Sequence, residues 1–283
     1  MKKGEKSVGV ARQYTGTAGE TVNAQVGVFL AYASKKGTAF VDRSLYLPRE
    51  WTEDSARCAE AGIPQTVGFA TKIELAKRML KRAFEADVPA RWVVADSFYG
   101  RSHGFRHWLE KRGRSYVVMV PKTNAVRYQR CRKKIARLVE CLPEEAWAPV
   151  ATEEDPNGRH PWEWVCLVLS GDSRRGTRRW LLGRRSRDDP DDLLAFYQAY
   201  GPEKKTPVGE LVRICQARWA VEEGFAEAKG EVGLDHYEVK KWKAWHRYVT
   251  LSLLAHAYLV AMRLSSGSEQ EEVGDKRGIA IPT

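Results

Sequence analysis

A short apolar run that ends in an acidic residue most constrains what this chain can fold into. Residues 91–95 read Arg-Trp-Val-Val-Ala, and Asp96 follows them just before Ser97-Phe98-Tyr99-Gly100. The run has the character of a β-strand. A carboxylate at the carboxyl end of a buried strand, before a turn that contains glycine, is a common active-site position in open α/β sheets. The alternatives for Asp96 are an Asx-turn or a helix cap.

A second acidic residue lies in a predicted helix. Residues 217–229 combine good helix formers with several apolar side chains. At about 100° per residue, Glu222 lies about 40° round the helix from Arg218, and Lys229 lies about 20° from Arg218. One carboxylate and two cations therefore share a stripe, an arrangement that suits a metal ligand set among phosphates. The alternative is a surface helix with i,i+4 charge pairs.

Together, Asp96 and Glu222 indicate a two-metal phosphodiester site. The spacing Arg-x3-Glu-x6-Lys, formed by Arg218, Glu222 and Lys229, resembles the Tyr-Arg-Glu-Lys signature of DDE transposases from bacterial insertion sequences. Residues 93–100 resemble the block around the second Asp of that family, and residues 45–51 and 230–239 resemble other recurring blocks. The resemblance runs from about residue 3 to about residue 264, with the blocks in the family's order.

The sequence departs from this family in two respects. The Tyr of the signature falls on Cys215, three residues before Arg218. The first Asp of the family's triad is expected on a strand just upstream of residues 2–4, so we expect an N-terminally truncated transposase that also lacks the preceding helical region. When the sequence is compared with the family's blocks, Asp42 lies on a later strand and is a poor substitute for the first Asp of the triad.

The resemblance implies an α/β fold, an RNase H-like core missing its first strand, with a β-rich insertion subdomain. Asp96 and Glu222 lie 126 residues apart, a gap too long for a simple connection. The expected parts are 1–122, the first part of the core; 123–206, the insertion; 207–264, a helical part that closes the core; and 265–283, a polar, flexible tail.

The resemblance also implies the chemistry, which is metal-dependent DNA cleavage and strand transfer. Asp96 and Glu222 are the implied catalytic residues and ligands for Mg²⁺, for which Mn²⁺ can substitute. Arg218 and Lys229 are the implied phosphate ligands at the transposon end. Trp180 is a candidate for stacking on an unpaired base, with core packing as the alternative. The implied partners are the terminal inverted repeats and the target DNA, bound by at least a dimer.

Loss of the first Asp removes the carboxylate that bridges the two metals in this chemistry, so we expect this chain to be impaired. One explanation is a misassigned start codon, with a longer, active transposase. Another is a decayed, inert copy. A third, from a different class, is a non-catalytic DNA-binding remnant that regulates transposition by occupying transposon ends or trapping active partners. A weaker alternative is a host nuclease of the same fold.

Composition agrees with a nucleic-acid partner. The formal net charge is +11, and residues 72–137 hold 18 Lys and Arg against 5 Asp and Glu, the electrostatic footprint of a polyanion-binding protein. A second basic cluster contains Arg174, Arg175, Arg178, Arg179, Arg184, Arg185 and Arg187. The five cysteines form no Cys-x2-Cys pair, and His103 and His107 lack further ligands nearby, so no zinc site is predicted. We expect a cytoplasmic protein, nucleoid-associated on DNA, with no membrane partner. The apolar helix over 248–262 is too short to span a bilayer, and we interpret it as a buried core helix.

The hydrophobic pattern predicts the order of secondary structure. Strands are expected over 25–34 and 38–47, joined by a Lys35-Lys36-Gly37 turn, and an amphipathic helix over 73–86. The strand before Asp96, a helix over 103–112 and a strand over 116–120 follow. Within the insertion we expect a basic helix over 127–141, strands over 162–170 and 178–184, and a loop over 188–192. Helices are then expected over 209–229 and 243–264.

Overall fold

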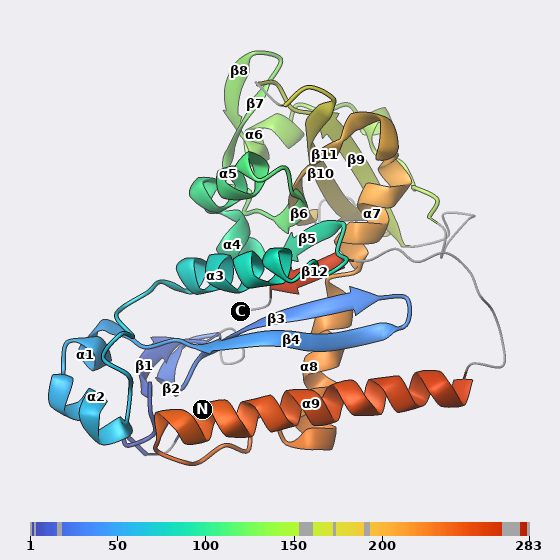
Figure 1. Ribbon diagram of the computed structural model, residues 1–283. Helices are drawn as coiled ribbons and strands as arrows, with labels where there is room; N and C mark the ends of the chain where they lie inside the picture. Colours follow the sequence, from blue (N-terminus) through green and yellow to red (C-terminus); the bar gives the residue numbers. More distant parts are fainter. Residues whose placement is uncertain are drawn as a thin grey trace. The chain divides into compact units, whose positions relative to one another are not determined.

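The computed structural model describes residues 2, 4–15, 19–152, 161–171, 174–189, 193–267 and 278–281. The chain forms a mixed α/β structure with two compact units (Figure 1). The discontinuous unit combines Met1–Pro89 with Trp219–Thr283, and the continuous unit is Ala90–Arg218. These boundaries differ from the expected division at 122/123 and 206/207, which remains a prediction.

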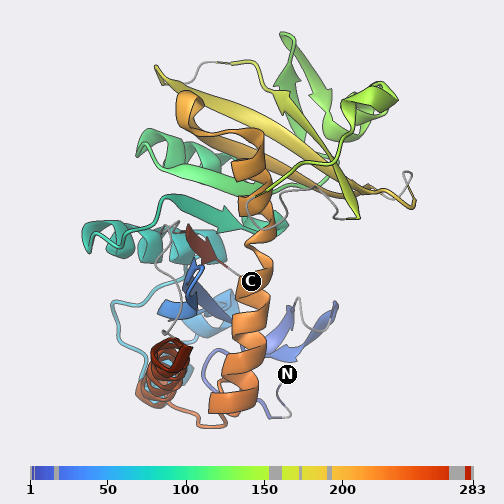
Figure 2. The same cartoon turned by 90° about the vertical axis from the view of Figure 1, so that its right-hand side faces the viewer.

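The discontinuous unit is built on three antiparallel strands in the order β4-β3-β12. The helix α3 covers one face of β3 and β4, and α8 and α9 cover the other face (Figures 1 and 2). Its elements are β1 (Ala11–Tyr14), β2 (Thr21–Ala24), β3 (Gly27–Ser34), β4 (Gly37–Leu45), α1 (Arg49–Thr52), α2 (Ser55–Ala61), α3 (Lys72–Glu85), α8 (Trp219–Val232), α9 (Trp242–Gly267) and β12 (Gly278–Ile281).

Local sequence explains why α3 begins and packs where it does. Thr71 caps the helix by accepting a hydrogen bond from the backbone N–H of Glu74, whose side chain in turn accepts from the backbone N–H of Thr71. This reciprocal capping box satisfies two backbone donors that a helix end leaves open. Leu75, Met79 and Leu80 share the buried face. The predicted amphipathic helix over 73–86 is therefore confirmed.

An aromatic cluster holds α8 and α9 against the strands. Phe40 of β4 lies 4.5 Å from Phe225 of α8 and 5.9 Å from Phe29 of β3, measured between ring centroids. His256 of α9 is fully buried beside Phe40, and its Nε2 lies 3.3 Å from Oε2 of Glu227 on α8. Burial of these rings contributes several kcal/mol to the packing of the two helices on the sheet.

The helix α9 differs from its prediction in length and burial. It runs for 26 residues, and it is long and apolar enough to cross a membrane by length and composition alone, with 22% of the apolar window buried. The expectation of a helix too short to span a bilayer is therefore wrong, and burial in the core holds for one face only. Trp245, Val249, Leu253 and His256 are buried, whereas Leu251, Leu254, Tyr258 and Met262 are exposed.

The continuous unit is built on a five-stranded mixed sheet in the order β5-β6-β11-β10-β9. The strands β5 and β6 are parallel and the other neighbours are antiparallel. The helices α4 and α5 lie on one face and α7 on the other (Figures 1 and 2). Its elements are β5 (Trp92–Ala95), α4 (Ser97–Gly100), α5 (His103–Lys111), β6 (Ser115–Met119), β7 (Ala125–Tyr128), β8 (Cys131–Lys134), α6 (Ile135–Val139), the 3₁₀ turns Glu144–Ala146 and Glu203–Lys205, β9 (Trp162–Val168), β10 (Thr177–Ser186), β11 (Leu193–Pro202) and α7 (Val208–Gln216).

The structure corrects two predicted helices. Residues 127–141 do not form one basic helix: β7 and β8 pair as a hairpin, and only Ile135–Val139 is helical. The two turn residues, Gln129 and Arg130, have φ of +46° and +67°, which is the turn geometry of a tight hairpin. The helix expected over 209–229 is interrupted between α7 and α8.

The strand β11 and the end of the chain also depart from expectation. β11 was not predicted, yet it joins β10 to β6. Part of the tail expected to be flexible belongs to α9 and to β12, while residues 268–277 and 282–283 lie outside the described residues. The loop expected over 188–192 is described only to residue 189.

Candidate functional site

Asp96 occupies the position that its sequence context predicts, directly after a fully buried strand. The strand β5 pairs in parallel with β6, from Trp92 opposite Ser115 to Ala95 opposite Val118. The Oδ1 atom of Asp96 accepts hydrogen bonds from the backbone N–H of Phe98 at 2.8 Å and of Tyr99 at 3.4 Å. Asp96 is therefore the N-cap of α4. It has the capping role given above as the alternative, and it also lies at the strand end that is predicted as an active-site position.

Gly100 fixes α4 close to the neighbouring strand. A Cβ atom at this position would lie 1.9 Å from the backbone oxygen of Met119, at the end of β6. Only glycine allows the short helix to lie this close. Tyr99 beside it is fully buried, and burial, with a further contribution from the Asp96 charge, raises the pKa of its phenol. The turn after Asp96 is thus determined by packing, which holds the carboxylate at the strand end.

Glu222 and Lys229 lie two turns apart on α8. Val221, Gly224 and Ala228 form the buried side of this helix, and Glu222 is exposed in its first turn. A Cβ atom at Gly224 would lie 3.0 Å from Cγ2 of Thr38, which shows how closely α8 approaches β4. The Nζ atom of Lys229 lies 5.9 Å from the centroid of the Phe225 ring.

Arg218 is the last residue of the continuous unit and immediately precedes α8. It therefore lies outside α8, whereas the sequence predicts Arg218, Glu222 and Lys229 on one side of the same helix. Cys215, at the position of the signature Tyr, is buried in α7, and burial raises the pKa of its thiol. This residue packs in the core of the continuous unit.

Trp180 lies in the middle of β10, and its side chain is 6% exposed. This burial is that of a packing residue, which was the alternative to base stacking. The basic cluster around it is also partly structural. Arg185 contacts both Glu144 and Glu163, Arg178 contacts Glu203, and Arg179 contacts Glu110.

The candidate residues are divided between the two units. Asp96, Trp180 and Arg218 belong to the continuous unit, and Glu222 and Lys229 belong to the discontinuous unit. Across the described part of the chain, no three His, Cys, Asp or Glu residues gather in a group that could hold a metal ion. Asp42 is held in an ion pair with Arg82 at 2.8 Å, so it has a structural role on β4.

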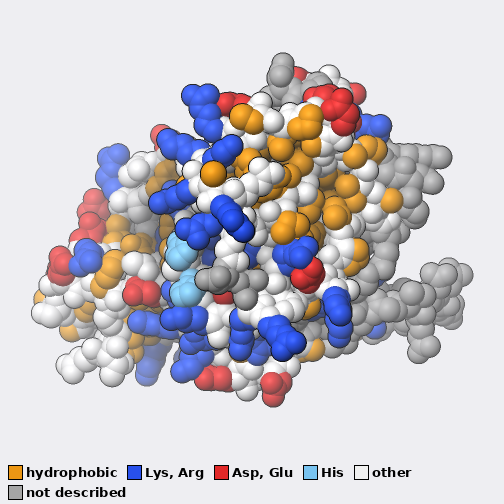
Figure 3. All heavy atoms as spheres, turned by 90° about the horizontal axis from the view of Figure 1, so that it is seen from above, with side chains coloured by type: hydrophobic (Ala, Val, Ile, Leu, Met, Phe, Trp, Pro, Cys, Tyr) orange, Lys and Arg blue, Asp and Glu red, His pale blue; other side chains and the backbone are white. Residues whose placement is uncertain are grey.

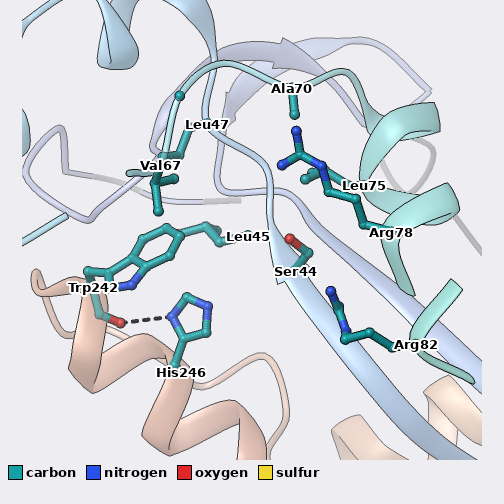
Figure 4. A pocket seen from close by; sticks show the side chains of 11 residues that line it. Ser44, Leu45, Leu47, Val67, Ala70, Leu75, Arg78, Arg82, Trp242 and His246 are labelled. Atoms are coloured by element: carbon teal, nitrogen blue, oxygen red, sulfur yellow. Dashed lines mark hydrogen bonds between the residues drawn. The ribbon is translucent and has the colours of Figure 1, made fainter. Parts of the chain in front are cut away.

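Two cavities were not predicted from the sequence. In the discontinuous unit, a cavity of about 160 Å³ lies among β4, α3 and the start of α9, with Arg78, Arg82 and His246 on its wall (Figure 4). His246 Nδ1 lies 3.1 Å from the backbone oxygen of Trp242, and burial, helped by the charge of Arg43, lowers its pKa. In the continuous unit, a cavity of about 420 Å³ lies between α5 and the β7–β8 hairpin.

Comparison with known protein families gives a match over the part of the chain that contains Asp96. Residues 1–137 match the family model described as DDE superfamily endonuclease, which covers just under half of the chain. Residues 1–137 are therefore similar to DDE superfamily endonucleases. It includes Asp96 and ends before Trp180, Arg218, Glu222 and Lys229. No curated protein matches the chain. The resemblance to DDE endonucleases is therefore confirmed over residues 1–137, while the Tyr-Arg-Glu-Lys signature and the N-terminal truncation stay predictions.

Proposed function

We propose that this protein is a transposase of the insertion-sequence type, which cleaves DNA and transfers the cut strand. The observation that carries the proposal is the position of Asp96, at the carboxyl end of a buried parallel strand within the residues that match the DDE superfamily. The order of a β-hairpin, a helix, a strand with an acid and a later helix with an acid also supports an RNase H-like core.

Asp96 and Glu222 are the proposed ligands of divalent metal ions. Both are carboxylates, the hard oxygen donors that Mg²⁺ prefers, and Mg²⁺ is often held by only one or two protein carboxylates together with substrate phosphates. The donor chemistry therefore fits. When bound, such a metal ion polarises phosphodiester oxygens and lowers the pKa of attacking water. Asp96 itself is held by the α4 cap, which orients its carboxylate.

Arg218 and Lys229 are the proposed phosphate ligands, since each is a fixed cation within a few residues of Glu222. The proposed substrates are the terminal inverted repeats and the target DNA, and pairing two ends requires at least a dimer on DNA. The burial of Trp180 supports a packing role for it rather than base stacking.

A second candidate function is that of a non-catalytic DNA-binding protein that regulates transposition. It is favoured by one observation, that Oδ1 of Asp96 already accepts hydrogen bonds from the backbone N–H groups of Phe98 and Tyr99 as the cap of α4. In this case the chain would occupy transposon ends without cutting them. Both candidates share a DNA partner and differ in whether the bound strand is broken.

A nicking assay on supercoiled DNA in Mg²⁺ or Mn²⁺ separates the two candidates. The informative variants are Asp96→Asn, which keeps a side chain able to cap α4, and Glu222→Gln. Glu223→Gln is the matched control, because Glu223 is the exposed neighbour of Glu222. For a transposase we expect nicking that both test variants lose and the control keeps. Salt-sensitive DNA binding without nicking would support the regulator, and absence of DNA binding would contradict both.

A further inference from the structure

The larger cavity lies on one face of the sheet in the continuous unit. Three strands contribute one residue each to this face: Tyr116 of β6, Arg179 of β10 and Gln198 of β11. The register places them together, because Tyr200 of β11 pairs with both Tyr116 and Arg179. Gln198 lies two residues before Tyr200, so its side chain points to the same face. The helix α5 and the β7–β8 hairpin supply the other walls. The cavity measures about 420 Å³, within the size range of small-ligand sites.

The acidic residue on the wall of this cavity, Glu110, is paired with other residues of the same wall. Glu110 accepts hydrogen bonds from Nε and Nη2 of Arg179, at 2.8 and 2.6 Å, and from the Tyr116 hydroxyl at 2.8 Å. Burial acts to raise the pKa of Glu110, but these partners outweigh it and lower the pKa. Glu110 is 9% exposed. Its charge is therefore matched chiefly by Arg179, and Arg127 and Arg132 lie on the same wall.

Two of those arginines face each other across the hairpin. Arg127 and Arg132 are directly paired in the β7–β8 register, and both line the cavity. Like charges directly opposite on a two-stranded sheet are destabilising. Among the described residues, neither has a carboxylate oxygen within 4.0 Å. An anion between the two guanidinium groups would remove this repulsion.

The rest of the wall carries further hydrogen-bond donors beside Glu110. Arg106 of α5 is 8% exposed and donates a hydrogen bond to the backbone oxygen of Gly100. His103 and His107 stack at the rim, with ring centroids 5.9 Å apart and an interplanar angle of 17°. Their ring N–H groups are further donors. Figure 3 shows Lys and Arg side chains gathered around His side chains on one face of the molecule.

We propose that this cavity binds a phosphate group of DNA, with Arg127 and Arg132 as its principal ligands. Guanidinium groups match the oxygens of a phosphate in pairs. The inference rests on the proposed function for the source of the phosphate, a DNA backbone. The charge distribution favours that source over a free phosphate, because the continuous unit holds 25 Lys and Arg against 16 Asp and Glu, and the discontinuous unit holds 22 against 20.

Two double variants of the same hairpin test the site. Arg127→Gln with Arg132→Gln removes the cavity pair. Lys133→Gln with Lys134→Gln removes the same charge from exposed residues of β8 that do not line the cavity. All four side chains are exposed, so neither variant should unfold the hairpin. DNA binding is measured by fluorescence anisotropy between about 50 and 200 mM salt, and thermal stability is measured with inorganic phosphate, pyrophosphate and a nucleoside monophosphate.

For a DNA phosphate site, we expect the arginine variant to bind DNA about tenfold more weakly. We also expect it to lower the slope of log K against log salt by about 0.9, because one phosphate contact is lost. The lysine variant should change the slope by less than half as much. Equal losses in the two variants would overturn the proposal, because they would indicate a diffuse basic surface.

Two further outcomes separate this inference from the proposed function. If the chain binds DNA and the arginine variant binds it equally well, the cavity site is wrong and the proposed function stands. If the chain does not bind DNA but free phosphates stabilise it, and the arginine variant abolishes that stabilisation, the DNA source and the proposed function are both wrong. If the arginine variant changes neither DNA binding nor the thermal stabilisation by phosphates, the site does not exist.

Discussion

Gly100 is the residue on which the position of Asp96 most depends. Gly100→Ala places a Cβ atom 1.9 Å from the Met119 backbone oxygen, so α4 or β6 must shift. We expect the free energy of unfolding to fall by about 1–3 kcal/mol, measured by urea denaturation. Because Asp96 caps α4, we also expect lower nicking activity if the chain is a nuclease.

Gly104 provides a matched control for this prediction. It lies in α5, only four residues further on, and a Cβ atom there would meet only Ser102 Oγ, at 3.9 Å. Alanine is favoured over glycine in a helix by about 1 kcal/mol, so Gly104→Ala should be neutral or stabilising. Equal effects at the two positions would contradict the close approach of α4 to β6.

At the scale of elements, the β7–β8 hairpin depends on its two turn residues. Gln129 and Arg130 both have positive φ, a conformation that Asn and Gly adopt at little cost. The double substitution Gln129→Asn with Arg130→Gly should therefore stabilise the chain by about 1 kcal/mol. The same change would destabilise a helix over 127–141 by at least as much. The sign of the change in melting temperature thus distinguishes the two structures.

The elements predicted correctly are those whose signal is local. The helix α3 has a cap and an apolar stripe in its own sequence, and β5 is a short apolar run with an acid at its end. The sequence predicts a helix in place of the basic hairpin because Lys and Arg are good helix formers. The two strands are stabilised by pairing with each other, which helix propensity does not reveal. The strand β11 depends on hydrogen bonds to β10 and to the distant β6, which its apolar sequence does not reveal.

The candidate site was predictable to the same extent. Asp96 could be identified because its strand and turn are contiguous in the sequence. The anion cavity could not, because α5, β6, the hairpin, β10 and β11 each contribute one or a few residues to it. Arg127 and Arg132 become a pair only when the hairpin forms. Sequence spacing alone makes them two of many basic residues.

At the scale of the whole molecule, stability should depend on pH through His246. Its pKa is lowered in the folded state, chiefly by burial and further by Arg43, against the opposing hydrogen bond to Trp242. The unfolded chain therefore takes up a proton that the folded chain resists, so the free energy of unfolding falls as pH decreases below about 6.5. Above that pH the contribution is fully present.

Comparison with His246→Asn isolates this effect. The amide can still donate to the backbone oxygen of Trp242 but does not titrate. Between about pH 7 and pH 5.5, the original chain should lose more stability than the variant, measured by urea denaturation at each pH. Parallel curves for the two proteins would show that His246 does not contribute.

The division of the chain also sets an order of events during synthesis. The continuous unit is complete once residue 218 has left the ribosome, whereas Met1–Pro89 needs the helices and strand of Trp219–Thr283 to cover its sheet. Met1–Pro89 is translated first but is expected to fold last. Until α8 and α9 are translated, Phe29 and Phe40 cannot contact Phe225 and His256. In ribosome-stalled chains that end near residue 250, we expect Ala90–Arg218 to resist protease and Met1–Pro89 to be cleaved. This is the reverse of the usual order, in which the N-terminal part folds first.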